Sequence, residues 1–198
     1  MSISKIIIGL TLSLLLGSSV AIAADFGKGL EAKNSGDFKT ALAEWIPLAE
    51  QDNAMAQFNL GHMYANGYGV PENDKTAVKW YTLAAEQGYA MAQYQLGIMY
   101  ANGRGVPEND KTAVKWYTLA AEQEYAMAQR YLGAMYDFGD GVPENGKTAV
   151  KWYNLASYNG NKNAGENKDK IAKQMTPADI SKAQDMSSLC LESNYTDC

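Results

Sequence analysis

The chain has 198 residues, of which 46% are hydrophobic and 20% are charged, and its net charge is −5 at pH 7. An acidic chain without a basic patch does not favour nucleic-acid binding. It contains one histidine, His62, and two cysteines, Cys190 and Cys198. This inventory excludes sites built from several histidines or from a repeated Cys–His arrangement, so we expect no metal and no cofactor.

Residues 1–23 have the three-part pattern of a secretory signal peptide: one lysine (Lys5), an apolar run over residues 6–16, and a small-x-small motif that ends at Ala23. An uncleaved membrane anchor is the alternative, but the apolar run is shorter than the ~20 residues that a spanning helix needs. We expect cleavage after Ala23, which leaves 16 basic and 22 acidic residues and a net charge of −6. The protein would then be periplasmic or secreted, without stable membrane insertion.

The motif GVPEN-(D/G)-KTAVKWY occurs three times, beginning at Gly69, Gly105 and Gly141, with a spacing of 36 residues. A fixed period of this size predicts stacked supersecondary units that share one continuous core. Residues 54–89 and 90–125 differ at only five positions, which are 58, 59, 62, 68 and 88. The third unit, from residue 126, is less similar.

Each unit predicts two helices, because its apolar residues recur at helical spacing. In the first unit these residues are Ala56, Leu60, Met63 and Tyr64, followed by Ala77, Trp80, Tyr81 and Ala84. We interpret the tryptophans that share one repeat position as core residues; they are Trp80, Trp116 and Trp152.

Glycines and acids mark the ends and the packing of these helices. A glycine inside a helix costs about 0.5–1 kcal/mol relative to alanine, so its recurrence predicts a close helix–helix approach. The recurring glycines are Gly61, Gly97 and Gly133. We expect Asp74 and Asp110 to be the N-caps of the second helices, with Gly146 at that place in the third unit.

The combined pattern, A-x-x-x-L-G-x-M-Y, then G-x-G-V-P, then K-T-A-V-K-W-Y-x-L-A, resembles the Sel-1-like repeat family, a longer-looped relative of the tetratricopeptide repeat. The resemblance implies an all-α fold, an α/α solenoid of about four helix-turn-helix repeats in a right-handed superhelix. We assign 26–53 to a divergent tetratricopeptide-like first repeat, 54–89, 90–125 and 126–161 to Sel-1-like repeats, and 162–198 to C-terminal capping helices with a disulfide tail.

Cys190 and Cys198 both lie within the last nine residues, and in an exported protein such a pair usually forms a disulfide. The bond would close a short loop in the tail and fix the cap. The repeats themselves contain no cysteine pairs. They therefore depart from the cysteine-rich branch of the family, some members of which are described as penicillin-binding or weakly β-lactam-hydrolysing.

No catalytic residues are predicted. His62 is replaced by Ile98 and Ala134 in the next two repeats, which suits an exposed position on a helix better than a general base. The recurring acids occur once per loop, whereas a catalytic pair would occupy one site.

Between the two near-identical units, positions 58, 59 and 62 change on the first helix, and 58 and 62 lie opposite its apolar stripe. In tetratricopeptide repeats this face lines a concave groove that holds peptides. The resemblance therefore implies a partner-binding face formed by Met55, Phe58, Asn59, His62, Asn66, Met91, Tyr94, Gln95, Ile98, Asn102, Met127, Arg130, Tyr131 and Phe138. We expect Phe58, Tyr94 and Phe138 to be an exposed aromatic row, which favours binding over neutral drift on a solvated face.

These observations predict a non-enzymatic exported scaffold that binds a protein or peptide partner through its concave face, in envelope complex assembly, regulation or host interaction. The alternative is a cell-wall-related enzyme, or a penicillin-binding or β-lactamase-like protein with weak hydrolysis. It rests on analogy with the cysteine-rich branch alone.

Overall fold

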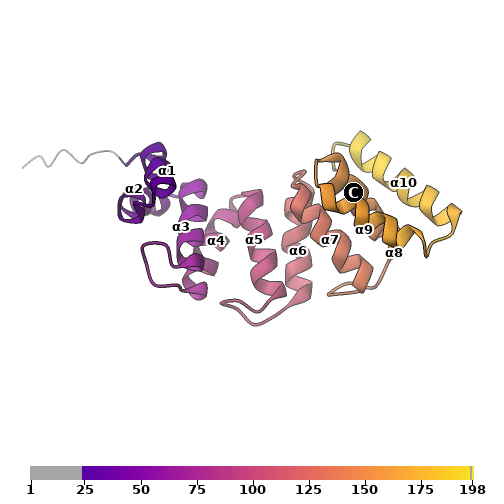
Figure 1. Cartoon of the computed structure of the whole chain (residues 1–198), viewed down its shortest axis with the longest axis horizontal. Coiled ribbons are helices and arrows are strands. Elements are labelled where there is room, and N and C mark those ends of the chain that lie inside the picture. Colours follow the sequence, from indigo (N-terminus) through magenta and orange to yellow (C-terminus); the bar gives the residue numbers. More distant parts are fainter. Residues whose placement is uncertain (1–23, 197) are drawn as a thin grey trace, which may run out of the picture.

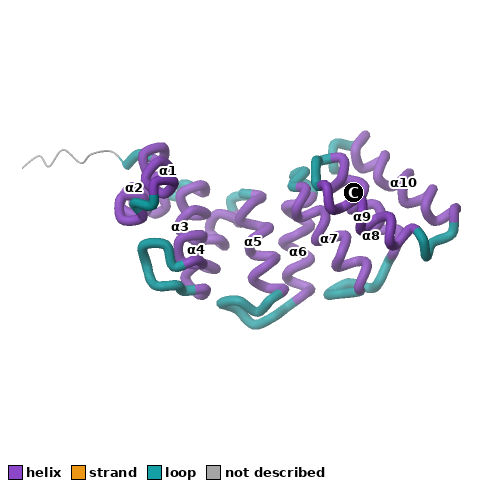
Figure 2. The backbone as a smooth tube through the Cα atoms, in the orientation of Figure 1, coloured by secondary structure: helices purple, strands orange, loops and turns teal. Residues whose placement is uncertain are grey.

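The computed structural model describes residues 24–196 and 198, so the predicted signal peptide lies outside the described residues. Within the described part the chain forms ten helices and no strand. They are α1 (Phe26–Ser35), α2 (Phe38–Glu50), α3 (Ala54–Asn66), α4 (Asp74–Glu86), α5 (Ala90–Ala101), α6 (Asp110–Ala121), α7 (Ala126–Phe138), α8 (Gly146–Tyr158), α9 (Lys162–Ala172) and α10 (Pro177–Glu192). Consecutive helices pack along one axis, joined by loops (Figures 1 and 2), which confirms the predicted all-α solenoid.

The two helices of each Sel-1-like unit meet where a glycine faces a tyrosine ring. A Cβ atom on Gly61 of α3 would lie 2.6 Å from Tyr81 of α4, and one on Gly133 of α7 would lie 2.8 Å from Tyr153 of α8. Gly97 faces Tyr117 in the same way. The three rings are 1–2% exposed. The close approach predicted from the mid-helix glycines is therefore confirmed.

The divergent first repeat, residues 26–53, makes the same contact with a different aromatic residue. Gly29 of α1 faces the indole of Trp45 on α2, and this indole donates a hydrogen bond to the Phe26 carbonyl at 3.3 Å. Trp45 thus holds the repeat position of Tyr81 rather than that of Trp80. Trp80 packs against the core, as expected, but it is only partly buried, because the tyrosine beside it faces the glycine.

Trp116 is partly buried in the same manner as Trp80, whereas Trp152 is 3% exposed. The third tryptophan differs because α10 packs against α8 and covers it. Burial at this repeat position therefore depends on the neighbouring element.

An asparagine caps the second helix of each Sel-1-like unit, one residue before the predicted position. The caps are Asn73, Asn109 and Asn145, whose side chains accept hydrogen bonds from the backbone three residues later at 2.9–3.2 Å. The predicted N-cap role of Asp74 and Asp110 is therefore wrong. Both begin their helices, where a negative charge interacts favourably with the helix dipole. Gly146 removes no cap, because Asn145 is retained.

A buried glutamine joins each repeat to its neighbours, and these residues are Gln57, Gln93 and Gln129. Gln93 shows the pattern: its amide nitrogen donates to the Ala85 carbonyl at 3.1 Å, and its oxygen accepts from Gln123 at 2.7 Å. The equivalent bonds recur at Gln57 and Gln129. Both ends of each buried amide are thus satisfied, and one side chain connects its own helix to the preceding second helix and to the turn after its own second helix.

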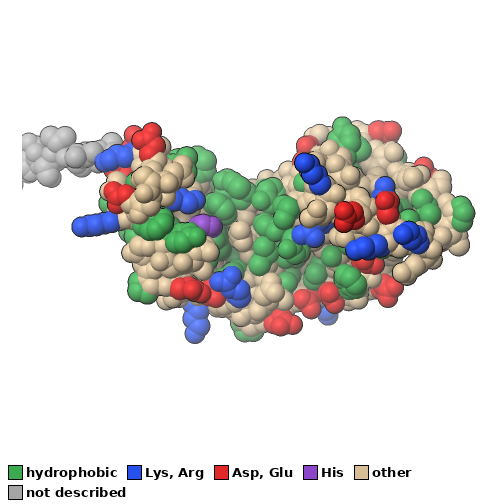
Figure 3. All heavy atoms as spheres, viewed as in Figure 1, with side chains coloured by type: hydrophobic (Ala, Val, Ile, Leu, Met, Phe, Trp, Pro, Cys, Tyr) green, Lys and Arg blue, Asp and Glu red, His purple; other side chains and the backbone are tan. Residues whose placement is uncertain are grey.

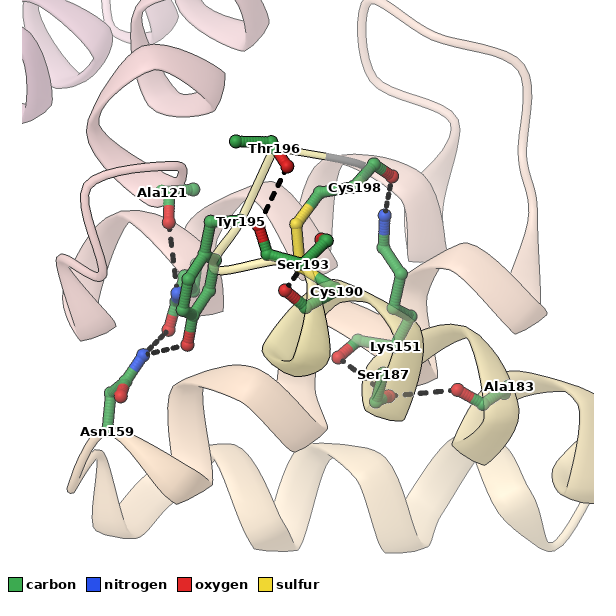
Figure 4. Close-up of a disulfide and its surroundings, with 11 residues drawn as sticks. Ala121, Lys151, Asn159, Ala183, Ser187, Cys190, Ser193, Tyr195, Thr196 and Cys198 are labelled. Carbon is green, nitrogen blue, oxygen red and sulfur yellow. Dashed lines mark hydrogen bonds between the residues drawn. A yellow bond between two sulfur atoms is a disulfide. The ribbon is translucent and has the colours of Figure 1, made fainter.

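The C-terminal tail closes this series of amide contacts. Asn159 donates to the Gln129 side chain at 3.0 Å and to the Tyr195 hydroxyl at 2.6 Å (Figure 4). Tyr195 is 7% exposed and belongs to the core beneath α10. The predicted disulfide between Cys190 and Cys198 is present and holds the tail around Tyr195. The bond is consistent with an oxidising compartment.

Lys151 is buried under the same tail. It is 3% exposed and donates a hydrogen bond to the Cys198 carbonyl (Figure 4). Its ammonium group also lies 4.1 Å from the centre of the Trp152 ring. Lys115, which holds the equivalent position one repeat earlier, is exposed. Burial lowers the pKa of Lys151 to about 8, although the charge of Glu122 opposes the shift.

We expect Gly97→Ala to lower the free energy of unfolding by about 1–3 kcal/mol, because the new methyl group collides with the buried Tyr117 ring. The control is Gly165→Ala in α9, where the nearest atom would lie 4.0 Å away. The control should gain about 0.5–1 kcal/mol from the better helix former. Urea denaturation followed by circular dichroism measures both. Equal stability of Gly97→Ala and wild type would contradict the close contact.

The lowered pKa of Lys151 predicts a pH effect of known sign. Between about pH 8 and the ordinary value of 10.5, the unfolded state binds more protons than the folded state, so stability rises with pH. One pKa unit corresponds to about 1.4 kcal/mol. Between pH 7 and 9, the free energy of unfolding should therefore rise by about 1 kcal/mol more in wild type than in Lys151→Met. Urea denaturation at both pH values measures this difference. Lys115→Met, at an exposed lysine, is the control. If wild type showed a similar pH-dependent rise in the free energy of unfolding relative to Lys115→Met, the assignment to Lys151 would be refuted.

Candidate functional site

The candidate site is the surface formed by the first helices of the three Sel-1-like units, α3, α5 and α7, which we call the first-helix face. Hydrophobic side chains gather in the middle of the molecule over these helices, where the outline is hollowed between the two ends (Figure 3). Of the fourteen residues predicted to bind a partner, five are exposed: Met55, Asn66, Asn102, Met127 and Phe138. Seven are partly buried: Phe58, His62, Met91, Gln95, Ile98, Arg130 and Tyr131. The remaining two, Asn59 and Tyr94, are buried at 8% and 7% exposure.

The expectation of an exposed aromatic row is therefore wrong for Tyr94, and Phe58 is only partly exposed. The tyrosine that ends the same unit folds over each of them: Tyr89 lies 5.3 Å from the Phe58 ring, and Tyr125 lies 5.3 Å from the Tyr94 ring. Phe138 has no such cover and is 73% exposed. The aromatic residues thus belong to the core in two repeats and to the surface in the third.

A tyrosine cluster connects α5, α6 and α7 beneath this face. The Tyr94 ring lies 5.6 Å from that of Tyr131, and the Tyr131 ring lies 5.5 Å from that of Tyr117. Burial raises the pKa of both Tyr94 and Tyr117 well above the ordinary value of 10.0. Their hydroxyls therefore remain protonated at neutral pH, and the cluster serves packing.

His62 lies beside Tyr68, with 5.6 Å between the ring centroids. Its Nδ1 atom is buried without a hydrogen-bond partner, and burial, with a smaller effect from Lys33, lowers its pKa. The ring is therefore neutral at pH 7, and no described carboxylate orients it as the acid of a catalytic pair would. Residues 24–196 and 198 also contain no group of three histidine, cysteine or acidic side chains arranged to hold a metal.

In the third unit, a hollow of about 240 Å³ lies between α7 and α9. Its lining residues are Arg130, Ala134, Asp137, Phe138, Tyr153, Asn167 and Lys170. The Arg130 guanidinium lies 4.4 Å from the centre of the Tyr131 ring, and its buried Nε atom has no hydrogen-bond partner. Burial and the nearby Glu144 raise the pKa of Asp137.

Sequence reasoning named Arg130 and Phe138 but missed Asp137, Asn167 and Lys170. Asp137 could have been found by aligning the second and third units, because Ala101 holds the equivalent position. Asn167 and Lys170 lie on α9, where the repeat pattern has ended, so no comparison between repeats identifies them. The first-helix face therefore combines exposed apolar groups with one cationic hollow, an arrangement suited to binding.

The sequence profile of the Sel1 repeat matches residues 54–89, 90–125 and 126–161, more than half of the chain. The chain belongs to the Sel1 repeat family. Sel1 repeats generally mediate protein–protein interactions, and proteins built from them are generally non-enzymatic scaffolds. None of the curated proteins is significantly similar to this chain.

Solved structures of Sel1 repeat proteins are similar to this one. A Sel1 repeat protein from Oxalobacter formigenes shares 36% identity with a TM-score of 0.69, over 74% of this chain and 58% of its own. A protective antigen of uropathogenic Escherichia coli strains shares 27% identity with a TM-score of 0.52, over 86% of this chain and 46% of its own. This chain thus spans about half the length of both.

Cysteine-rich protein B of Helicobacter pylori is similar at 23% identity with a TM-score of 0.53, over 66% of this chain and 93% of its own. At this identity the likeness shows the fold alone.

Proposed function

We propose that this chain is an exported Sel1 repeat adaptor that binds a protein or peptide partner through the first-helix face. The observation that carries the proposal is the exposure of large apolar side chains there: Met55 is 45% exposed, Met127 is 37% exposed and Phe138 is 73% exposed. Exposed methionine and aromatic side chains adapt to varied partner surfaces, and apolar patches on a soluble fold often mark interaction sites. The envelope role is the assembly or regulation of a complex, or contact with a host.

Two further observations support export. The disulfide between Cys190 and Cys198 suits an oxidising compartment such as the periplasm or the extracellular space. Residues 1–23 read as a signal peptide, and in the described part of the chain every helix is too short or too polar to cross a membrane. One structurally similar protein is a protective antigen of uropathogenic Escherichia coli strains, which supports host contact as one of the roles.

The enzyme alternative has no comparable support. Its basis is the cysteine-rich branch of the family, whereas each repeat of this chain lacks a cysteine pair and the likeness to cysteine-rich protein B extends to the fold alone. The adaptor function is therefore the better-supported proposal.

Export predicts a specific mature terminus. Expression in a bacterium with an intact secretion system should yield a periplasmic or secreted protein that begins at Ala24, as read by N-terminal sequencing and intact mass. Replacing Ala23 with a large residue, Ala23→Phe, should block cleavage, since the processing site requires small side chains. Cytoplasmic protein that retains residues 1–23 and free Cys190 and Cys198 thiols would show that export is wrong.

The binding face is best tested by site-specific photo-crosslinking in the exporting cell. A benzoylphenylalanine at Met55 or Met127 should give a discrete adduct with one partner, identified by mass spectrometry, because these side chains lie exposed on the first-helix face. The controls carry it at Leu83 or Leu119, which are 42% and 44% exposed on second helices. Identical adducts from both pairs would contradict the assignment. Tyr94 is unsuitable as a test position, because it is buried.

A further inference from the structure

The third unit has changed in a concerted way around the hollow between α7 and α9. Helix α7 differs from the equivalent residues of the second unit at five positions, which are 130, 131, 134, 137 and 138. Four of these residues line the hollow, and the fifth, Tyr131, contacts the Arg130 guanidinium. The rest of α7 is identical to α5, so the divergence of this helix is confined to one place in the structure.

The substitutions make room and add a positive charge. Arg130 stands where the second unit has the buried Tyr94, and Ala134 stands where it has Ile98. Among the described residues, Arg130 forms no ion pair, and its Nε–H group is buried without an acceptor. A buried donor without a partner costs free energy, and a bound acceptor would satisfy it.

Helix α9 supplies further hydrogen-bond donors from the opposite side. Asn167 and Lys170 line the hollow there. Residues 162–173 carry four lysines and two acids in a chain whose net charge is −5, and basic side chains are frequent over α9 in Figure 3. The charged residues that line the hollow are Arg130, Lys170 and Asp137, which together carry one net positive charge. Glu144 lies close enough to raise the pKa of Asp137, so the positive charge of the region is small. That charge matches a monoanion better than a phosphate.

Phe138 gives the hollow an apolar border. Its side chain lines the hollow and is 73% exposed. A ligand that fits this arrangement has an acidic oxygen pair for the guanidinium and an apolar group for the ring. A guanidinium donates two parallel hydrogen bonds to a carboxylate, and this planar match makes arginine the usual carboxylate ligand.

We propose that the hollow lined by Arg130, Asn167, Lys170 and Phe138 binds a carboxylate that is adjacent to an apolar side chain of the partner peptide. The carboxylate is either a glutamate or aspartate side chain or the end of a chain, which share this chemistry. The proposal rests on the proposed function, because it names the chemical group that the first-helix face would recognise.

The test is a titration of the ¹⁵N-labelled protein with two pairs of small probes, followed by NMR. N-acetylphenylalanine carries a terminal carboxylate beside a ring, and its amide is the neutral control. The blocked dipeptide Ac-Phe-Glu-NH₂ carries a side-chain carboxylate, and Ac-Phe-Gln-NH₂ is its control. We expect at least one carboxylate probe to shift the Arg130 Nε–H resonance and the amides of residues 130–138, with at least tenfold tighter binding than its amide control.

Binding by the first pair alone would assign the site to a peptide end, and binding by the second alone to an acidic side chain. Equal binding of carboxylate and amide probes, or no shift of the Arg130 resonance up to 20 mM probe, would overturn the proposal. This comparison needs no variant, so it decides the matter even if a substitution unfolds the protein.

Two arginine-to-tyrosine variants locate the effect. Arg130→Tyr restores the residue of the second unit and should weaken carboxylate binding at least tenfold. The matched control, Arg104→Tyr, restores the residue of the first unit in a loop where Arg104 is paired with Asp74, and it should leave affinity within twofold. Equal losses in both variants would refute the site. If crosslinking at Met127 captures a partner while all carboxylate probes fail, this inference is wrong and the proposed function stands.

Discussion

The contact between a glycine and a buried aromatic ring sets the geometry of every unit in this solenoid. Because Gly61, Gly97 and Gly133 have no side chain, the second helix of each unit approaches until its tyrosine ring lies on the backbone of the first. The divergent first repeat, residues 26–53, achieves the same approach with Gly29 and Trp45. This spacing determines which side of each first helix faces inward, and therefore which side chains are left for the first-helix face.

Much of the fold could be predicted from the sequence, because the 36-residue period and the mid-helix glycines are local and repeated. The details that failed depend on neighbours. Whether tyrosine or tryptophan fills the core follows from which ring faces the glycine, and periodicity does not distinguish adjacent positions. The burial of Tyr94 could not be predicted from its own helix, because Tyr125, which ends the same repeat, and Tyr131, which comes from the next one, both pack against it. The hollow likewise needs α9, which lies beyond the repeat pattern.

The third unit illustrates how a repeat protein separates stability from recognition. Its frame is unchanged: Gly133 still faces Tyr153, and Asn145 still caps α8. At the surface, however, it has exchanged a packed aromatic residue for an arginine with an unsatisfied nitrogen, and an asparagine for the exposed Phe138. Both exchanges are unfavourable for an isolated fold, and the proposed partner would offset this cost. The conserved frame allows such exchanges because their effects remain within one unit and its neighbour.

The buried glutamines carry a consequence for how such a chain can change over evolutionary time. Each amide donates to the unit before it and accepts from a residue just after its own second helix, so every copy brings both a donor and an acceptor of the series. If one whole 36-residue segment were duplicated or deleted, every buried amide would still have a partner. The condition is that residues 26–53 and the Tyr195 tail remain at the two ends. Recombination within a gene of this kind can therefore change the number of repeats while the hydrogen bonds of the buried amides remain complete. Each new repeat would extend the surface available to a partner.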